Sequence, residues 1–157
     1  MADTKPITPD GYKRLQDELE RLWREDRPKV VNEVADAAAM GDRSENAEYI
    51  FGKKKLREID RRIGYLSKLL QRLTPTPTTR NKGDRVRFGC TVTVADENGK
   101  EKTYQIVGED EVEAAHGKIS MKSPLGMALL EKKVGAIVVV HRPMGDLELE
   151  IVKLEYV

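Results

Sequence analysis

The chain has 157 residues, of which 39% are hydrophobic and 35% are charged, and its formal net charge is +1. This length suits one ordinary domain or two small ones, and the hydrophobic content can support a core without disulfides. Cys90 stands alone, which excludes an internal disulfide. No apolar run approaches the roughly 18 residues that a membrane span needs, and the N-terminus does not resemble a signal peptide. We therefore expect a cytoplasmic protein with no membrane partner.

The first predicted element is an amphipathic helix over about residues 9–40. Thr8-Pro9-Asp10 opens it, and its apolar residues then recur in steps typical of one helix face: Tyr12, Leu15, Leu19, Leu22, Val30, Val34 and Ala37. Pro28 lies inside this helix and removes one backbone hydrogen bond, so we expect a kink or a local break.

A second amphipathic series predicts a helix over about residues 44–73. Its apolar positions match a coiled-coil seam: Tyr49, Leu56, Ile59, Ile63, Leu66, Leu70 and Leu73. The numbers of facing residues, such as Leu19 with Leu66, add to a nearly constant value. This relation predicts an antiparallel hairpin that folds back near residue 43 and is about 47 Å long at roughly 1.5 Å per residue. Gly52 and Gly64 should each cost about 1 kcal/mol relative to Ala.

The pattern changes after the proline-rich segment 74–79, which cannot continue the helix. Period-two runs predict strands at 85–88, 91–94, 103–107, 137–141 and 147–154, with a hairpin at Asn98-Gly99 and a short helix over 124–130. We therefore predict an α+β fold with three parts. These are an antiparallel coiled-coil domain over 1–74, a linker over 75–82, and a small domain with a mostly antiparallel sheet over 83–157.

Two carboxylates are predicted at the far end of the hairpin. Asp42 and Glu45 are three residues apart, close enough to converge on a hard cation if the turn presents them outward. The same spacing fits a capping box with Asp42 as the helix N-cap, and spacing alone favours capping. Their position at the end of the hairpin favours a catalytic role, because a thin rod can carry carboxylates into a narrow site on another macromolecule.

The second predicted helix carries eight basic and four acidic residues, a net charge of +4, whereas the rest of the chain carries about −3. Lys54, Arg57 and Arg61 share one face of this helix. Such a face fits a phosphate-binding stripe. It equally fits a solvated surface with salt bridges such as Arg57 to Asp60 or Glu58 to Arg61.

The remaining candidates favour structural roles. His116 and His141 are far apart in sequence and have no partner cysteine, a pattern that does not fit a zinc site. Cys90 precedes a predicted strand, and we interpret it as a small packed residue.

Several segments resemble the Gre family of bacterial transcript-cleavage factors, most closely its GreB branch. The likeness covers nearly the whole chain and rests on Leu22–Pro28, Gly41–Tyr49, Lys53–Arg62, Ile106–Glu111, Ser123-Pro124 and Leu154–Tyr156. In this family the hairpin enters the secondary channel of a backtracked RNA polymerase. There the tip carboxylates help to hold the second catalytic Mg²⁺ and its attacking water.

This resemblance implies that Asp42 and Glu45 contribute carboxylates to the active centre of RNA polymerase. The polymerase cleaves the RNA, so the chain is expected to have no enzymatic activity and no cofactor of its own. Ser44, Asn46 and Tyr49 are expected to support the tip by orienting RNA or water.

The resemblance also assigns roles to the two remaining surfaces. Lys53, Lys54, Arg57 and Arg61 are expected to bind the backtracked RNA. The C-terminal domain is expected to be FKBP-like and to dock on the polymerase through Ser123 and Pro124, with Lys122 where family members often have Asp or Asn. The implied partners are RNA polymerase and its nascent RNA, and the protein is expected to be a monomer.

Two other interpretations remain open from the sequence. An inhibitory relative would occupy the same channel without promoting cleavage, and its tip would carry more acidic residues. A chaperone-like hairpin that grips client proteins would carry apolar residues at its tip, and Gly41–Asn46 contains none.

Overall fold

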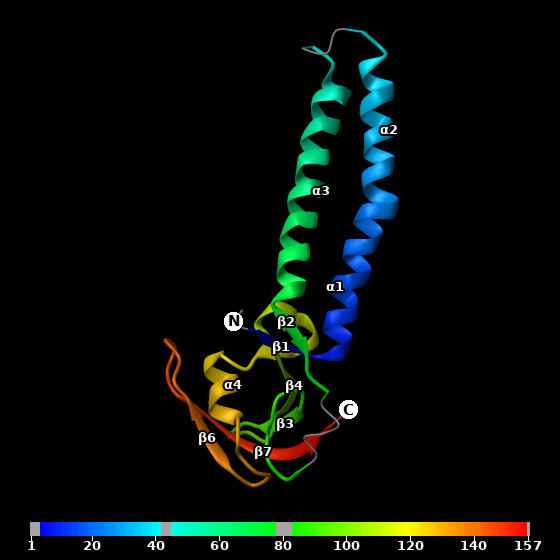
Figure 1. The fold of residues 1–157 in the computed structure, drawn as a ribbon. Coiled ribbons are helices and arrows are strands. Elements are labelled where there is room, and N and C mark those ends of the chain that lie inside the picture. Colours follow the sequence, from blue (N-terminus) through cyan, green and yellow to red (C-terminus); the bar gives the residue numbers. More distant parts are fainter. Residues whose placement is uncertain (1–3, 42–44, 78–82, 157) are drawn as a thin grey trace. The chain divides into compact units, whose positions relative to one another are not determined.

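The computed structural model describes residues 4–41, 45–77 and 83–156 (Figure 1). The contacts within the chain divide it into two units. We name them the hairpin unit, which contains Tyr12–Leu73, and the sheet unit, which contains Lys5–Gly11 and Thr74–Val157. The N-terminal boundary therefore differs from the expected domain of residues 1–74, because Lys5–Gly11 belongs with the sheet unit.

The hairpin unit consists of helices, as predicted. In chain order these are α1 (Pro9–Arg21), a π-helix η1 (Leu22–Asp26), α2 (Arg27–Ala38) and α3 (Ala47–Gln71), and α2 and α3 run antiparallel in Figure 1. The first residues of α1, up to Gly11, belong to the sheet unit. The expectation of an N-terminal helical hairpin followed by a sheet domain is thus confirmed, with both predicted helices slightly shorter than expected. None of the helices in the described ranges is long and apolar enough to cross a membrane.

The expected break near Pro28 takes the form of a π-helix. The backbone N–H of Arg27 donates to the carbonyl of Leu22, five residues earlier, and Pro28 lies in the first turn of α2. Proline has no backbone N–H, and its ring clashes with the carbonyl four residues before it in a regular helix. The wider π-turn just before Pro28 accommodates this mismatch.

The predicted seam forms the core of the hairpin unit. Its buried residues are Leu22, Val30, Ile59, Ile63 and Leu66, and Leu15, Leu19, Val34 and Leu56 pack against them. The prediction is wrong at the end of α3, where Leu69 is buried and Leu70 is only partly buried. Steps of three and four residues both continue a helical seam, so the pattern alone did not separate these two leucines.

The two glycines of α3 lie in different surroundings. A Cβ atom added to Gly52 would lie 2.8 Å from Cγ2 of Val34 in α2, whereas one added to Gly64 would meet nothing within 4 Å. Gly52 therefore permits a close approach of the two helices. Gly64 makes no such contribution.

The sheet unit contains a five-stranded sheet in the order β5-β4-β3-β7-β6. The strands are β3 (Thr91–Ala95), β4 (Glu101–Val107), β5 (Lys118–Ser120), β6 (Ile137–Val140) and β7 (Leu147–Glu155). Only β4 and β5 pair in parallel, so the predicted mostly antiparallel sheet is confirmed. The helix α4 (Pro124–Leu129) packs against β5 and β6, and two 3₁₀-helices, η3 (Glu109–Glu111) and η4 (Ala114–His116), follow β4.

The predicted strand at residues 85–88 is absent from the sheet. Arg85 forms one isolated bridge with Lys133, and the backbone of Val86 exchanges hydrogen bonds with Lys132 and Glu131. Val86 is nevertheless fully buried. Its β-branched side chain therefore reflects core packing, which the alternating pattern cannot distinguish from strand pairing.

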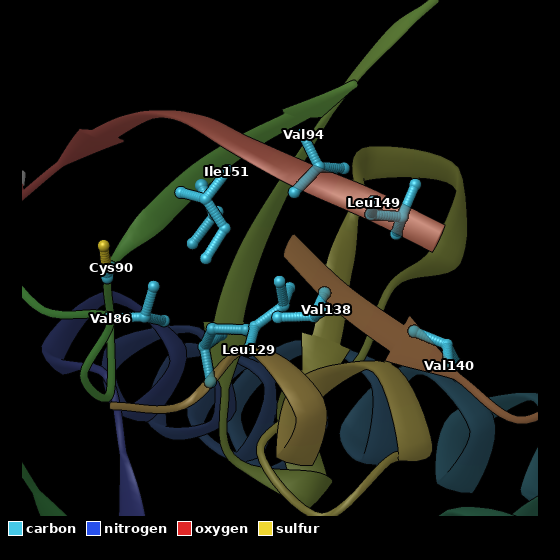
Figure 2. Close-up of a cluster of buried hydrophobic side chains, with 10 residues drawn as sticks. Val86, Cys90, Val94, Leu129, Val138, Val140, Leu149 and Ile151 are labelled. Carbon is cyan, nitrogen blue, oxygen red and sulfur yellow. The ribbon is translucent and has the colours of Figure 1, made fainter. Parts of the chain in front are cut away.

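The core of the sheet unit lies between the sheet and α4. Figure 2 shows side chains from several strands together with Leu129 of α4. Cys90 is one of these buried residues, and burial raises the pKa of its thiol. This location agrees with the interpretation of Cys90 as a packed residue.

A short strand at the N-terminus was not predicted. β1 (Lys5–Ile7) pairs with β2 (Leu73–Pro75), so the expected linker begins in an extended strand. Next to β1, the carboxylate of Glu111 accepts hydrogen bonds from the backbone N–H of Thr8 at 2.7 Å and from the backbone N–H of Gly108 at 3.0 Å. These bonds hold Lys5–Gly11 within the sheet unit.

Candidate functional site

The tip of the hairpin begins where α2 ends. The N–H of Ala39 donates to the carbonyl of Ala35, and the N–H of Met40 donates to the carbonyl of Ala37 at 3.2 Å. Gly41 follows with φ of +138°, a backbone conformation that residues with a Cβ atom rarely adopt. The glycine therefore lets the chain leave the helix sharply.

Asn46 organises the start of α3. Its side-chain carbonyl accepts a hydrogen bond from the backbone N–H of Tyr49 at 3.1 Å, which makes it the N-cap. Its amide group donates to the carbonyl of Ala37 at 2.6 Å. One side chain thus caps α3 and ties it to the last turn of α2.

The capping role that the sequence allowed for Asp42 therefore belongs to Asn46. Glu45 lies in the turn just before this cap, its side chain is exposed, and it forms no hydrogen bond or ion pair with another described residue. Asp42 and Ser44 lie outside the described residues. The described part of the chain therefore shows no structural role for the carboxylate of Glu45.

Tyr49 is the third residue predicted to support the tip. It lies in the first turn of α3, its side chain is partly buried, and its backbone N–H is the one that Asn46 caps. The structure therefore brings Glu45, Asn46 and Tyr49 together at one end of α3.

The predicted RNA-binding residues lie exposed along α3. Lys53, Lys54, Arg57 and Arg61 are all exposed, and none of them forms an ion pair with another residue in the described ranges. The alternative pair between Arg57 and Asp60 is wrong, because Asp60 accepts a hydrogen bond from Nε of Arg27 across the hairpin at 2.7 Å. These cations are thus available to an external anion.

A second pair joins the helices further along α3. Nε and an Nη atom of Arg62 donate to the two carboxylate oxygens of Glu18, at 2.7 and 3.0 Å. These hydrogen bonds lower the pKa of Glu18 below its usual value. The guanidinium of Arg62 also lies 5.5 Å from the centre of the Tyr65 ring. Arg62 is therefore a structural residue, unlike its neighbour Arg61.

Large exposed apolar side chains beside the tip were not predicted from the sequence. Met40, Ile50 and Phe51 are 77%, 52% and 68% exposed. All three fall outside the predicted seam, and this is the signal that would have identified them. Large exposed apolar side chains next to a polar tip are suited to contact with another molecule.

Ser123 and Pro124 form the start of α4. Oγ of Ser123 accepts from the backbone N–H of Gly126 at 3.0 Å and donates to the carbonyl of Ser120 at 2.7 Å. Pro124 occupies the first turn, where a missing N–H costs nothing. Because the hydroxyl is engaged on both sides, the exposed ring of Pro124 is the more accessible part of this predicted docking segment.

Comparison with known proteins covers both units. The family description "Transcription elongation factor, N-terminal" matches residues 5–74, and "Transcription elongation factor, GreA/GreB, C-term" matches residues 80–156. Transcription elongation factor GreB of Pseudomonas aeruginosa is 47% identical over 155 residues, which cover 99% of this chain and 92% of that protein. Transcription elongation factor GreB of Haemophilus influenzae is 46% identical over 156 residues, 99% of each chain. A solved structure of the transcription factor Gfh1 aligns at 27% identity and a TM-score of 0.47, covering 99% of each chain.

Proposed function

The chain belongs to the GreA/GreB family of transcription elongation factors and is closest to GreB, and from this premise we propose that it stimulates the cleavage of backtracked RNA by RNA polymerase. In this proposal the hairpin unit enters the secondary channel of the polymerase. Arrested complexes are rescued because cleavage creates a new RNA 3′ end at the active centre.

The exposed carboxylate of Glu45 is the observation that carries this proposal. Asn46 already caps α3, so Glu45 is free to act on another molecule. Together with Asp42, it would supply oxygen ligands of the type that Mg²⁺ prefers. Two carboxylates provide only part of an octahedral shell, so the proposed site is complete only inside the polymerase.

The role of the tip in the reaction is to help hold the Mg²⁺ and to orient the attacking water. A second Mg²⁺, held in the polymerase active centre with the help of Asp42 and Glu45, would supply Lewis-acid stabilisation of the charge that develops at the phosphodiester. The carboxylate of Glu45 positions the water that attacks the phosphodiester and accepts a hydrogen bond from it. Asn46 keeps the start of α3 fixed during this step, because its two hydrogen bonds hold both helices. Polymerase remains the catalyst.

The basic face of α3 is proposed to hold the backtracked RNA. Lys53, Lys54, Arg57 and Arg61 are exposed cations without a described acidic partner, as a phosphate-binding surface requires. RNA that extends past the tip would follow this face. This arrangement favours cleavage of longer fragments.

The sheet unit is proposed to be the FKBP-like domain that docks on the polymerase. The exposed Pro124 at the start of α4 is the proposed contact, and Ser123 holds this start in place through its two hydrogen bonds. Lys122 lies beside this segment and forms an ion pair with Glu109 at 3.6 Å.

The proposal is tested with a backtracked polymerase complex that carries 5′-labelled RNA and Mg²⁺. We expect rapid shortening of the RNA with the wild-type protein. Glu45→Gln and Asp42→Asn should each reduce the cleavage rate by about 10²-fold or more, as for loss of a group that stabilises a transition state. Glu48→Gln is the control, because it removes an exposed carboxylate from the first turn of α3.

Polymerase binding is measured in parallel for every variant. Lost cleavage with retained binding supports the carboxylate mechanism. Tight binding of the wild-type protein without cleavage would overturn it and would identify an inhibitory factor that blocks the channel.

A further inference from the structure

The sheet unit contains a pocket of about 230 Å³ that no predicted role accounts for. It lies at the end of the sheet where the β3–β4 and β6–β7 turns meet. The strand pairing places both turns there, because Ala95 pairs with both Glu101 and Glu150, and Val140 pairs with Leu147. The start of α4 lies beyond the opposite end of β4, about 20 Å away at roughly 3.3 Å per residue. The pocket is therefore separate from the proposed docking segment.

The floor of the pocket is apolar. Val94 and Leu149 are 1% and 6% exposed, and Leu147 and Tyr104 are partly buried beside them. Val94 and Leu149 belong to the core face of the sheet and are labelled in Figure 2, where they lie farther from α4 than Val138 does. The pocket is thus the part of this face that α4 leaves uncovered.

The rim of the pocket is positively charged. Lys100, Lys102 and Arg142 line it, all three are exposed, and none forms an ion pair with another residue of the described chain. The single acid in the lining, Asp96, is already used, since its Oδ1 accepts hydrogen bonds from the N–H groups of Asn98 and Lys100, both at 2.9 Å. Nε of Arg142 donates to the carbonyl of Gly145 at 3.3 Å, which leaves its charge without an acidic partner. An apolar floor under such cations favours a ligand with one apolar side chain and anionic groups around it.

We propose that this pocket binds an acidic peptide segment of a partner protein through one large aliphatic side chain. The volume is below the roughly 300 Å³ at which typical small-molecule sites begin, but it suits a single anchoring side chain of the kind that dominates protein interfaces. Carboxylates on either side of the anchor would pair with Lys100, Lys102 and Arg142. The side chain would contact Val94 and Leu149.

A nucleic acid fits this pocket less well. Single-stranded nucleic acids bind to exposed aromatic rings on which their bases stack. The only aromatic lining residue, Tyr104, packs against the core of the sheet unit. The aliphatic floor therefore favours a peptide.

The test uses the full-length protein and a fluorescein-labelled peptide with one central leucine between two pairs of glutamates. Fluorescence anisotropy should show saturable binding at physiological ionic strength. Replacing the leucine of the peptide by glycine should weaken binding at least tenfold. In the ¹⁵N spectrum, the peptide should shift the backbone amides of Lys102, Tyr104 and Leu149.

Variants of the exposed rim test the charges, and circular dichroism checks that each variant is folded. Lys102→Glu and Arg142→Glu should each weaken binding at least tenfold. Lys132→Glu, which reverses an exposed charge elsewhere in the sheet unit, should leave it unchanged. The proposal would be overturned if no saturable binding is seen, or if binding does not depend on the leucine of the peptide. It would also be overturned if Lys132→Glu weakens binding equally, or if an oligouridylate binds more strongly at the same residues. None of these outcomes depends on RNA cleavage.

Discussion

In the sheet unit, the side chains of Ser123 and Glu111 form hydrogen bonds with the backbone around them. Ser123 caps α4 and donates to Ser120, and Glu111 accepts hydrogen bonds from Thr8 and Gly108. In the hairpin unit, Glu45 and the four cations Lys53, Lys54, Arg57 and Arg61 are exposed and form no ion pair with another described residue. Substitution of the first group should therefore affect stability, whereas substitution of the second should affect the reaction with a partner.

Asn46 is the exception in the hairpin unit, and its substitution should have the largest effect on stability. Asn46→Ala removes the cap of α3 and the bond to Ala37, each of which contributes about 1 kcal/mol. We expect the free energy of unfolding to fall by about 2 kcal/mol, measured by denaturant titration with far-UV circular dichroism. Ser123→Ala, which removes the cap of the short helix α4, should cost about 1 kcal/mol. Equal stability of Asn46→Ala and the wild type would show that the tip does not depend on this tie.

Substitutions on the basic face of α3 should instead affect RNA cleavage more than stability. Combined substitution of Lys53, Lys54 and Arg57 by Ala should reduce cleavage of long RNA fragments about tenfold, because these cations contact phosphates, and should leave stability nearly unchanged. Release of dinucleotides should change little. The fragments are resolved on sequencing gels, and Lys68→Ala serves as a control that removes an exposed charge near the far end of the same helix. An equal loss for dinucleotides would argue against RNA binding by this face.

The two glycines of α3 sharpen the comparison within one helix. Gly64→Ala should raise the free energy of unfolding by up to about 1 kcal/mol, because alanine has the higher helix propensity and the added methyl group meets open space. Gly52→Ala should instead lower it by about 1 kcal/mol, because Cγ2 of Val34 must move. Thermal unfolding of the two variants measures both changes. A stabilising effect at both positions would mean that the helices can separate at Gly52 without cost.

Loss of the ion pair between Glu18 and Arg62 should have the smallest effect on the free energy of unfolding. Arg62 lowers the pKa of Glu18 below its usual value of 4.5, so the pair stabilises the hairpin above that pH, and this stabilisation is lost as the pH falls through the lowered value. Glu18→Gln should therefore cost about 0.5 kcal/mol at neutral pH and progressively less as the pH falls below 4.5. Glu33→Gln is the control. A difference that does not depend on pH would show that the charge of Glu18 does not contribute.

The periodic features of the fold could be predicted from the sequence. The helical seam, the break at Pro28, the hairpin at Asn98-Gly99 and the four longer strands depend on local patterns that a sequence displays directly. β1, β2 and β5 could not be predicted, because strands of three residues carry no period and pair with distant parts of the chain. The burial of Leu69 instead of the predicted Leu70 could not be predicted either, since both positions satisfy the helical pattern.

Only part of the candidate functional site could be predicted, because only some of its features follow from local sequence patterns. Exposed charges on α3 follow from helix geometry, and the structure places Glu45, Asn46 and Tyr49 at one end of that helix. The spacing also allowed Asp42 as the cap, although Asn46 provides it, because several polar residues of the turn satisfy the spacing and only the backbone path selects one. The pocket between the two β-turns combines residues far apart in the chain, and no local motif marks it.

The Mg²⁺ dependence of RNA cleavage tests the central proposal most directly. A backtracked polymerase complex is saturated with the wild-type protein or with Glu45→Gln, and the cleavage rate is measured as the Mg²⁺ concentration increases. If the tip donates a metal ligand, the wild-type protein should reach half-maximal cleavage at a Mg²⁺ concentration at least tenfold lower than the variant. The same Mg²⁺ requirement for both proteins, at equal polymerase binding, would contradict the proposal that Glu45 helps to hold the metal.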